Sequence, residues 1–125
     1  MQAALELARQ SALEGEVPVG AVIVKDNEIV GTGRNKREYG KNALYHAEIE
    51  AIDSACKKLG GWRLWQCDMY VTLEPCPMCA GAIVESTYSL YVTILTSAPR
   101  YVSRSSLIIA TVSSLTSSAI VTGFS

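Results

Sequence analysis

Residues 70–83 read YVTLEPCPMCAGAI, and this stretch decides the fold. Apolar side chains that alternate with polar ones over residues 67–73 predict a strand. A proline in a first-turn position then opens a predicted helix over residues 77–85. Cys76 and Cys79, three apart at the start of that helix, can face one point. We therefore expect a strand that runs into a helix, with two thiols at the junction.

The chain's one histidine, His46, lies upstream in the segment His46-Ala47-Glu48. An imidazole and two thiolates can hold one zinc ion and leave a position open for water, as catalytic zinc sites do. A helix N-terminus lowers thiol pKa values, which favours the thiolates that a metal binds. Residues two apart diverge on a helix, so His46 and Glu48 can share a site only where the chain enters the helix. There Glu48 can act as base and then as acid.

The thiol pair has two other interpretations. The pair could be a redox couple, or half of a structural zinc site that Cys56 or Cys67 completes. The surroundings of the pair differ from a thioredoxin-like context, and Cys56 lies well inside the next predicted helix. H-x-E followed by P-C-x-x-C is the signature of zinc-dependent nucleobase deaminases, and the joint pattern is more specific than either part. A catalytic zinc site is therefore favoured.

The order of the other predicted elements indicates an α/β fold with layered helices. Leucine and alanine recur at helical spacing near the N-terminus, which predicts a helix. An apolar run followed by a turn and a second short strand predicts a hairpin. Ile49, Ile52 and Cys56 share one face of a further predicted helix. The predicted helices span residues 2–13 and 46–59, and the hairpin strands span residues 17–24 and 28–33. Residues 34–42 form a basic loop that is either simply solvated or in contact with phosphate.

Length and composition narrow the class of protein. The 125 residues fit a single domain, and 11 basic against 12 acidic side chains argue against a strongly basic nucleic-acid coat. No apolar run of about 18 residues suggests a membrane span, and the first 20 residues lack a signal-peptide pattern. We expect a cytoplasmic protein with reduced thiols.

The composition changes abruptly after Glu85. Residues 86–125 contain 11 Ser and 6 Thr but no Asp, Glu, Lys, Asn or Gln. Strand character returns in residues 88–95, 107–112 and 119–122, without a catalytic motif. The change indicates a frameshifted tail, with a diverged but genuine tail as the alternative; resequencing that yields a charged C-terminal helix would support the frameshift. The uncharged, β-prone stretch also carries an aggregation risk.

Three segments together resemble the bacterial tRNA-specific adenosine deaminases of the cytidine deaminase-like superfamily. They are EVPVGAV at residues 16–22, HAEI at residues 46–49 and YVTLEPCPMCAGAI at residues 70–83. The resemblance covers residues 2–86 and ends there, because the family's later basic strand and charged helix are not recognisable. It implies one three-layer α/β/α deaminase domain over residues 1–125, with a mixed five-stranded sheet flanked by helices, and a homodimer.

The resemblance also implies a reaction, the conversion of adenosine to inosine at the wobble position of a tRNA anticodon stem-loop. By position, His46, Cys76 and Cys79 are similar to the ligands of one Zn²⁺ ion, and Glu48 to the proton shuttle. The implied contacts to the flipped nucleoside come from residues around these: Asn35, Pro18, Val19, Ala47, Glu74 and Pro75. A deaminase of free bases or nucleosides such as guanine or cytidine is the first alternative. A zinc-binding pseudo-deaminase inactivated by its tail is the second.

Overall fold

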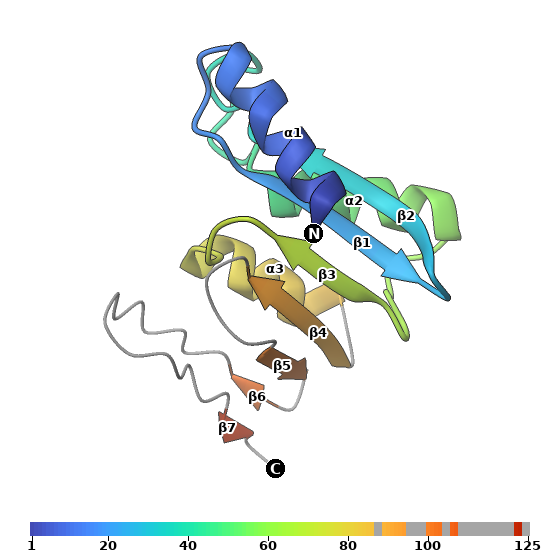
Figure 1. Cartoon of the computed structure of the whole chain (residues 1–125). Coiled ribbons are helices and arrows are strands. Elements are labelled where there is room, and N and C mark those ends of the chain that lie inside the picture. Colours follow the sequence, from blue (N-terminus) through green and yellow to red (C-terminus); the bar gives the residue numbers. More distant parts are fainter. Residues whose placement is uncertain (87–88, 95–99, 104–105, 108–121, 124–125) are drawn as a thin grey trace.

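The computed structural model describes residues 1–86, 89–94, 100–103, 106–107 and 122–123. In these residues, three helices alternate along the chain with the strands of a central sheet, as the α/β prediction requires (Figure 1). The helices are α1 (Gln2–Leu13), α2 (Ala47–Leu59) and α3 (Pro77–Ser86). The strands are β1 (Gly20–Lys25), β2 (Glu28–Arg34), β3 (Asp68–Val71), β4 (Ser89–Ile94) and β5 (Arg100–Ser103). The short strands β6 (Ser106–Leu107) and β7 (Thr122–Gly123) pair separately.

Strand pairing gives the central sheet mixed directions. β1 lies antiparallel to both β2 and β3, β3 lies parallel to β4, and β4 lies antiparallel to β5. The spatial order is therefore β2-β1-β3-β4-β5. A parallel pair needs a crossover connection, and α3 supplies it between β3 and β4. This crossover places the start of α3 directly after the end of β3.

Helices cover both faces of the sheet, with α1 on one face and α2 and α3 on the other (Figure 1). Glycines allow the close approach. A side chain at Gly20 would meet the backbone of α1, whereas side chains at Gly31 and Gly33 would meet the backbone of α2. Consequently α2 lies almost against β2, and the sheet fixes the point at which the chain enters α2.

Replacement of Gly33 by alanine is expected to destabilise the fold by about 1–3 kcal/mol, the usual cost of overpacking. The added methyl group would overlap backbone atoms of Ala47 and Ala51, which can yield only if α2 moves. Gly61→Ala is the matched control, because an added methyl group there meets nothing nearby. Urea unfolding measures both variants; equal midpoints would show that this contact between α2 and β2 is not tight.

Most predicted elements are confirmed with small shifts in their bounds. The first strand begins at Gly20 rather than at residue 17, because Pro18 has no N–H and the N–H of Val19 turns back to the carbonyl of Val17. The turn between β1 and β2 falls on Asp26 and Asn27, both with positive φ, as a tight hairpin demands.

The most buried face of α2 is a stripe of alanines, and the predicted apolar face lies beside it. The fully buried residues of this helix are Ala47, Ala51 and Ala55, whereas Ile52 and Cys56 are only partly buried against the core. The reason is the close approach to the glycines of β2, where only small side chains fit. Alanines therefore form the side of the helix that lies closest to β2, which the spacing of the larger apolar residues did not indicate.

The core lies between the sheet and α2, with the alternating residues of β3 at its centre. Met69 and Val71 are fully buried, as the sequence pattern predicted, and Ile83 of α3 joins them. Of the strands expected beyond Glu85, β4 matches residues 88–95, whereas most of residues 107–112 and 119–122 lies outside the described residues. Among the helices of the described part of the chain, none is long and apolar enough to cross a membrane.

Candidate metal centre and pocket

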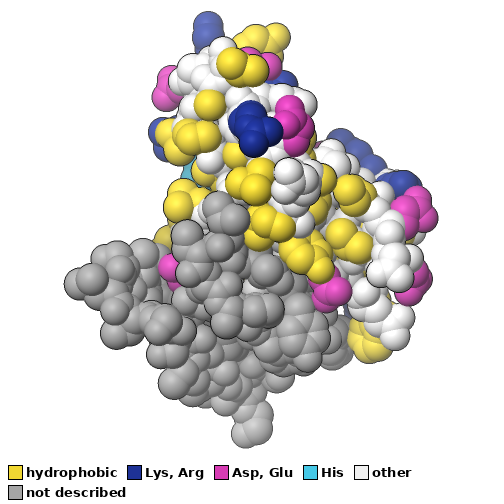
Figure 2. Space-filling model, viewed as in Figure 1, with side chains coloured by type: hydrophobic (Ala, Val, Ile, Leu, Met, Phe, Trp, Pro, Cys, Tyr) yellow, Lys and Arg dark blue, Asp and Glu magenta, His cyan; other side chains and the backbone are white. Residues whose placement is uncertain are grey.

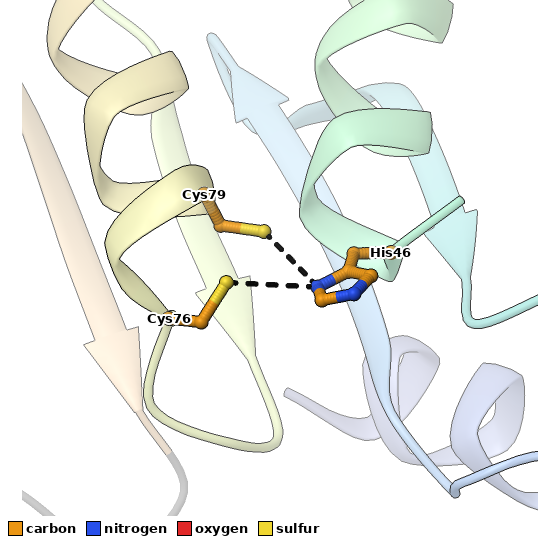
Figure 3. Close-up of side chains that lie close together, drawn as sticks. All are labelled: His46, Cys76 and Cys79. Atoms are coloured by element: carbon orange, nitrogen blue, oxygen red, sulfur yellow. Dashed lines mark hydrogen bonds between the residues drawn. The ribbon is translucent and has the colours of Figure 1, made fainter. Parts of the chain in front are cut away.

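The metal-ligating side chains predicted from the sequence meet where two helices begin. His46 is the N-cap of α2 and has extended backbone angles, so its side chain does not follow the regular spacing of the helix. Cys76 immediately precedes α3, and Cys79 lies in its first turn. Figure 3 shows both sulfur atoms directed at one ring nitrogen of His46. The ligand atoms of the three residues all lie within 4.8 Å of one another.

The distances fit a tetrahedral zinc ion. The Nδ1 atom of His46 lies 3.6 Å from Sγ of Cys76 and 3.5 Å from Sγ of Cys79. Zinc bonds of about 2.0–2.1 Å to nitrogen and 2.3 Å to sulfur, at tetrahedral angles, separate those atoms by about 3.6 Å. The two nearly equal distances therefore suit an ion shared by the imidazole and both thiolates. Three ligands leave a fourth position open.

Among the described residues, neither Cys56 nor Cys67 belongs to this ligand group. Both are free thiols, the first half-buried and the second buried. Burial raises the pKa of each thiol above its ordinary value. The structure thus offers no support for a structural site closed by a fourth cysteine.

The predicted effect of the helix start on thiol acidity is wrong for Cys79. Burial raises the pKa of this thiol strongly, and the neighbouring Glu48 carboxylate and Cys76 raise it further. Desolvation and like charge outweigh the helix dipole at this depth. A bound divalent cation reverses that balance, since metal coordination deprotonates a thiol. The donor set therefore suits a metal ion better than a redox pair.

Glu48 lies in the first turn of α2, and only 4% of its surface is exposed. Burial raises the pKa of its carboxyl above the ordinary value, whereas hydrogen bonds from its own backbone N–H and from Cys79 oppose the rise. A buried carboxyl with a raised pKa beside a metal site is suited to accept and return a proton near neutral pH. His46 and Glu48 share the site because His46 precedes the regular helix, as predicted.

A pocket opens beside this group. Its empty space is about 480 Å³, and it is open to solvent. His46, Glu48 and Cys76 form one part of its wall. The remaining lining residues come from three loops: Val17, Val19, Asn35, Arg37, Leu73 and Glu74. Apolar and polar side chains both line this open pocket, as is usual for sites that bind small ligands.

The predicted substrate-contacting residues divide into two groups. Asn35, Val19 and Glu74 line the pocket, whereas Pro18 and Pro75 neighbour it in sequence but are not among its lining residues. Ala47 is fully buried in the core and does not line the pocket either. Asn35 is also buried and is held in place by several contacts. Its N–H donates to the Val19 carbonyl and its side-chain amide to the Val17 carbonyl.

Three pocket residues were not singled out from the sequence. Val17 and Leu73 are exposed apolar residues inside the segments 16–22 and 70–83, and Arg37 lies in the basic loop. Proximity in sequence to Pro18 and Glu74 could have indicated the first two. Arg37 could have been found only by choosing among the four cations of the loop, and the sequence has no signal for that choice.

The fold and the site together define an α/β protein in which a His/Cys/Cys group suited to zinc lies beside an open pocket. The family model of the cytidine and deoxycytidylate deaminase zinc-binding region matches residues 1–95, and the chain belongs to this family. Proteins named tRNA-specific adenosine deaminase are among its similar relatives. That of Bacillus subtilis is 51% identical over 86 residues, which cover 69% of this chain and 53% of the relative. That of Buchnera aphidicola is 47% identical over 89 residues, 71% of this chain and 55% of the relative.

Solved structures give the same class of fold. A structure from a study of A-to-I editing by tRNA:A34 deaminases is 42% identical with a TM-score of 0.69, covering 75% of this chain and 73% of that one. Guanine deaminase from Bacillus subtilis is 39% identical with a TM-score of 0.67, covering 74% and 59%. The chain spans about half the length of the curated relatives it matches.

Proposed function

We propose that this protein is a zinc-dependent hydrolase that deaminates adenosine to inosine at the wobble position of a tRNA anticodon. The observation that carries the proposal is the ligand group His46, Cys76 and Cys79 beside the buried carboxyl of Glu48 in one pocket. The relatives named tRNA-specific adenosine deaminase support the choice of substrate.

His46, Cys76 and Cys79 would hold the zinc ion, which when bound supplies the Lewis acidity that lowers the pKa of water to about 7. Glu48 takes one proton from the attacking water and gives it to the purine ring nitrogen. It then takes the second proton from the new hydroxyl on C6 and gives it to the departing amine, so that a carbonyl remains at C6. Oxygen becomes bonded to C6, the C6–N bond breaks and ammonia leaves. The two proton transfers require one group that serves as base and then as acid, and the buried Glu48 has the position for both.

The loops around the pocket would hold the base after it leaves the stack. Asn35 offers its side-chain amide to the nucleoside, Val19 supplies an apolar wall with Pro18 beside it, and the Glu74–Pro75 backbone faces the amino group. Ala47 is included among the proposed contacts on the resemblance alone, since it is buried in the core. Support comes from the lining position and fixed orientation of Asn35 and from the lining positions of Val19 and Glu74.

The proposed partner is the tRNA anticodon stem-loop, bound by a cytoplasmic homodimer whose subunits each form one domain over residues 1–125. We further propose that the complete fold has the mixed five-stranded sheet between layers of helices that the resemblance implies. Figure 2 shows basic, acidic and hydrophobic side chains interspersed on the described part of the face that α1 covers. RNA contact is therefore expected close to the pocket, where Arg37 lies, rather than over this face.

Deamination of a free purine base is the second candidate. The similarity to the solved guanine deaminase structure favours it, because that protein is 39% identical to this chain. Zinc ligation and proton transfer serve both reactions equally well, so only the substrate separates the two candidates.

Parallel assays with one preparation of zinc-loaded protein decide between them. Inosine is measured by nuclease digestion of an adenosine-containing anticodon stem-loop, and ammonia release is measured from free guanine, cytidine and adenosine. We expect inosine in the stem-loop and little ammonia from the free compounds. Activity on free guanine alone would contradict the tRNA assignment and leave the zinc chemistry intact.

A further inference from the structure

We propose that Glu16 is a positioning residue that fixes the basic loop, residues 34–42, and thereby holds Arg37 at the wall of the pocket. The inference rests on the proposed function, because it assigns the loop a part in binding the substrate. Glu16 itself does not line the pocket. It is one of the few buried charged residues in the described part of the chain, with 6% of its surface exposed.

Both carboxylate oxygens of Glu16 accept hydrogen bonds from the backbone of the basic loop. Its Oε2 atom accepts the N–H of Glu38 at 3.1 Å, and its Oε1 atom accepts the N–H of Tyr39 at 2.6 Å. These partners lie more than 20 residues along the chain from Glu16. Successive backbone N–H groups that converge on one anion form a strong, charge-assisted contact. A loop on the surface is thus bound to a buried anchor.

The anchor is itself rigid. The backbone N–H of Glu16 donates to the carbonyl of Ser11 at the end of α1, at 2.9 Å. The hydroxyl of Ser11 in turn donates to the carbonyl of Asn35, also at 2.9 Å. Helix α1 therefore fixes both Glu16 and the residue at which the basic loop leaves β2.

Arg37 lies between the two fixed points of the loop. On one side its own N–H donates to the Oδ1 atom of Asn35 at 3.3 Å. On the other side the next two N–H groups bind the carboxylate of Glu16. The side chain of Arg37 is exposed and lines the pocket. The hydrogen bonds on either side of Arg37 fix its backbone, and the backbone position determines how the guanidinium group reaches the pocket wall. Without Glu16 that end of the loop loses its only buried charged anchor among the described residues.

The substitution Glu16→Gln tests the clamp, because it keeps the shape but places an amide donor against a backbone donor. Glu6→Gln is the matched control; Glu6 lies on the exposed part of α1 and pairs with Arg9 at 2.9 Å. Hydrogen exchange of the Glu38 and Tyr39 amides is measured in zinc-loaded protein without RNA. We expect exchange about tenfold faster or more in Glu16→Gln, since the two amides lose a charge-assisted acceptor. Unchanged protection would overturn the clamp.

The Kd for the anticodon stem-loop tests the consequence. We expect Glu16→Gln and Arg37→Ala each to weaken binding several-fold, the double variant to be no weaker than the worse single variant, and Glu6→Gln to bind as the wild type does. Additive losses, or loss of protection without loss of affinity, would overturn the role in substrate binding. If the wild type fails to bind the stem-loop, the proposed function fails, whereas the amide protection still decides the clamp. Zinc content and melting temperature check folding, and Glu16→Asp, which keeps the charge but shortens the reach, replaces Glu16→Gln if that variant does not fold.

Discussion

Replacement of Glu48 by alanine is expected to lower the rate of inosine formation by about 10²–10⁴-fold or more, the range that general acid–base groups contribute. The carboxyl is buried beside the ligand group and lines the pocket. Among the described residues that line the pocket, Glu74 is the one other acidic side chain that could transfer the proton. Zinc content should stay at one ion per chain, because Glu48 is not in the group of metal-ligating side chains. Single-turnover kinetics and metal analysis on the same sample measure both quantities.

Two further variants make this result specific. Glu48→Gln preserves the shape of the side chain and should be as inactive as Glu48→Ala, since its amide cannot accept and return a proton. Glu50→Gln changes a half-exposed carboxylate in the same helix turn, which pairs with Lys36 at 3.5 Å, and should retain activity within a few-fold. Full activity in Glu48→Ala would contradict the assignment. A wild type that binds zinc and RNA but deaminates neither the stem-loop nor the free bases and nucleosides would indicate a pseudo-deaminase.

Replacement of Cys76 by serine is expected to remove the zinc ion and, with it, activity. Loss of an outer-shell partner alone weakens metal affinity by about 10–100-fold, so loss of a direct thiolate ligand should exceed that range. The melting temperature should fall as well, because a metal that binds only the folded state stabilises it. Competition with a chromogenic chelator measures the affinity, and thermal unfolding with and without added zinc measures the coupling.

Cys56→Ser is the matched control for this variant. Both cysteines are free and half-buried, but Cys56 lies outside the ligand group. It should bind zinc as tightly as the wild type does. Equal zinc affinity in both variants would contradict the ligand set, and zinc loss in both would indicate a site that includes Cys56.

The sequence predicted the ligand group because its signals are local. A proline and a pair of cysteines mark the start of α3, and the position of His46 before α2 explains why it can share a site with Glu48 two residues later. Hairpin chemistry at Asp26 and Asn27 was equally local. These features depend on neighbours in the chain, so the pattern of residue types was sufficient.

The remainder depended on packing across the fold. The alanine face of α2 is buried because glycines of β2 lie against it, a relation between segments that periodicity within one helix cannot report. The clamp between Glu16 and the basic loop joins residues more than 20 positions apart through backbone atoms. The high pKa of Cys79 follows from its burial depth. None of these leaves a signature in residue type alone.

The most direct test of the central claim is the fraction of wobble adenosine converted to inosine in an anticodon stem-loop by protein of known zinc content. We expect the converted fraction to rise in proportion to bound zinc, to fall to zero on chelation and to return when zinc is restored. We expect no conversion by Glu48→Ala. Folded, zinc-loaded protein that binds the stem-loop and leaves its adenosine unchanged would contradict the claim.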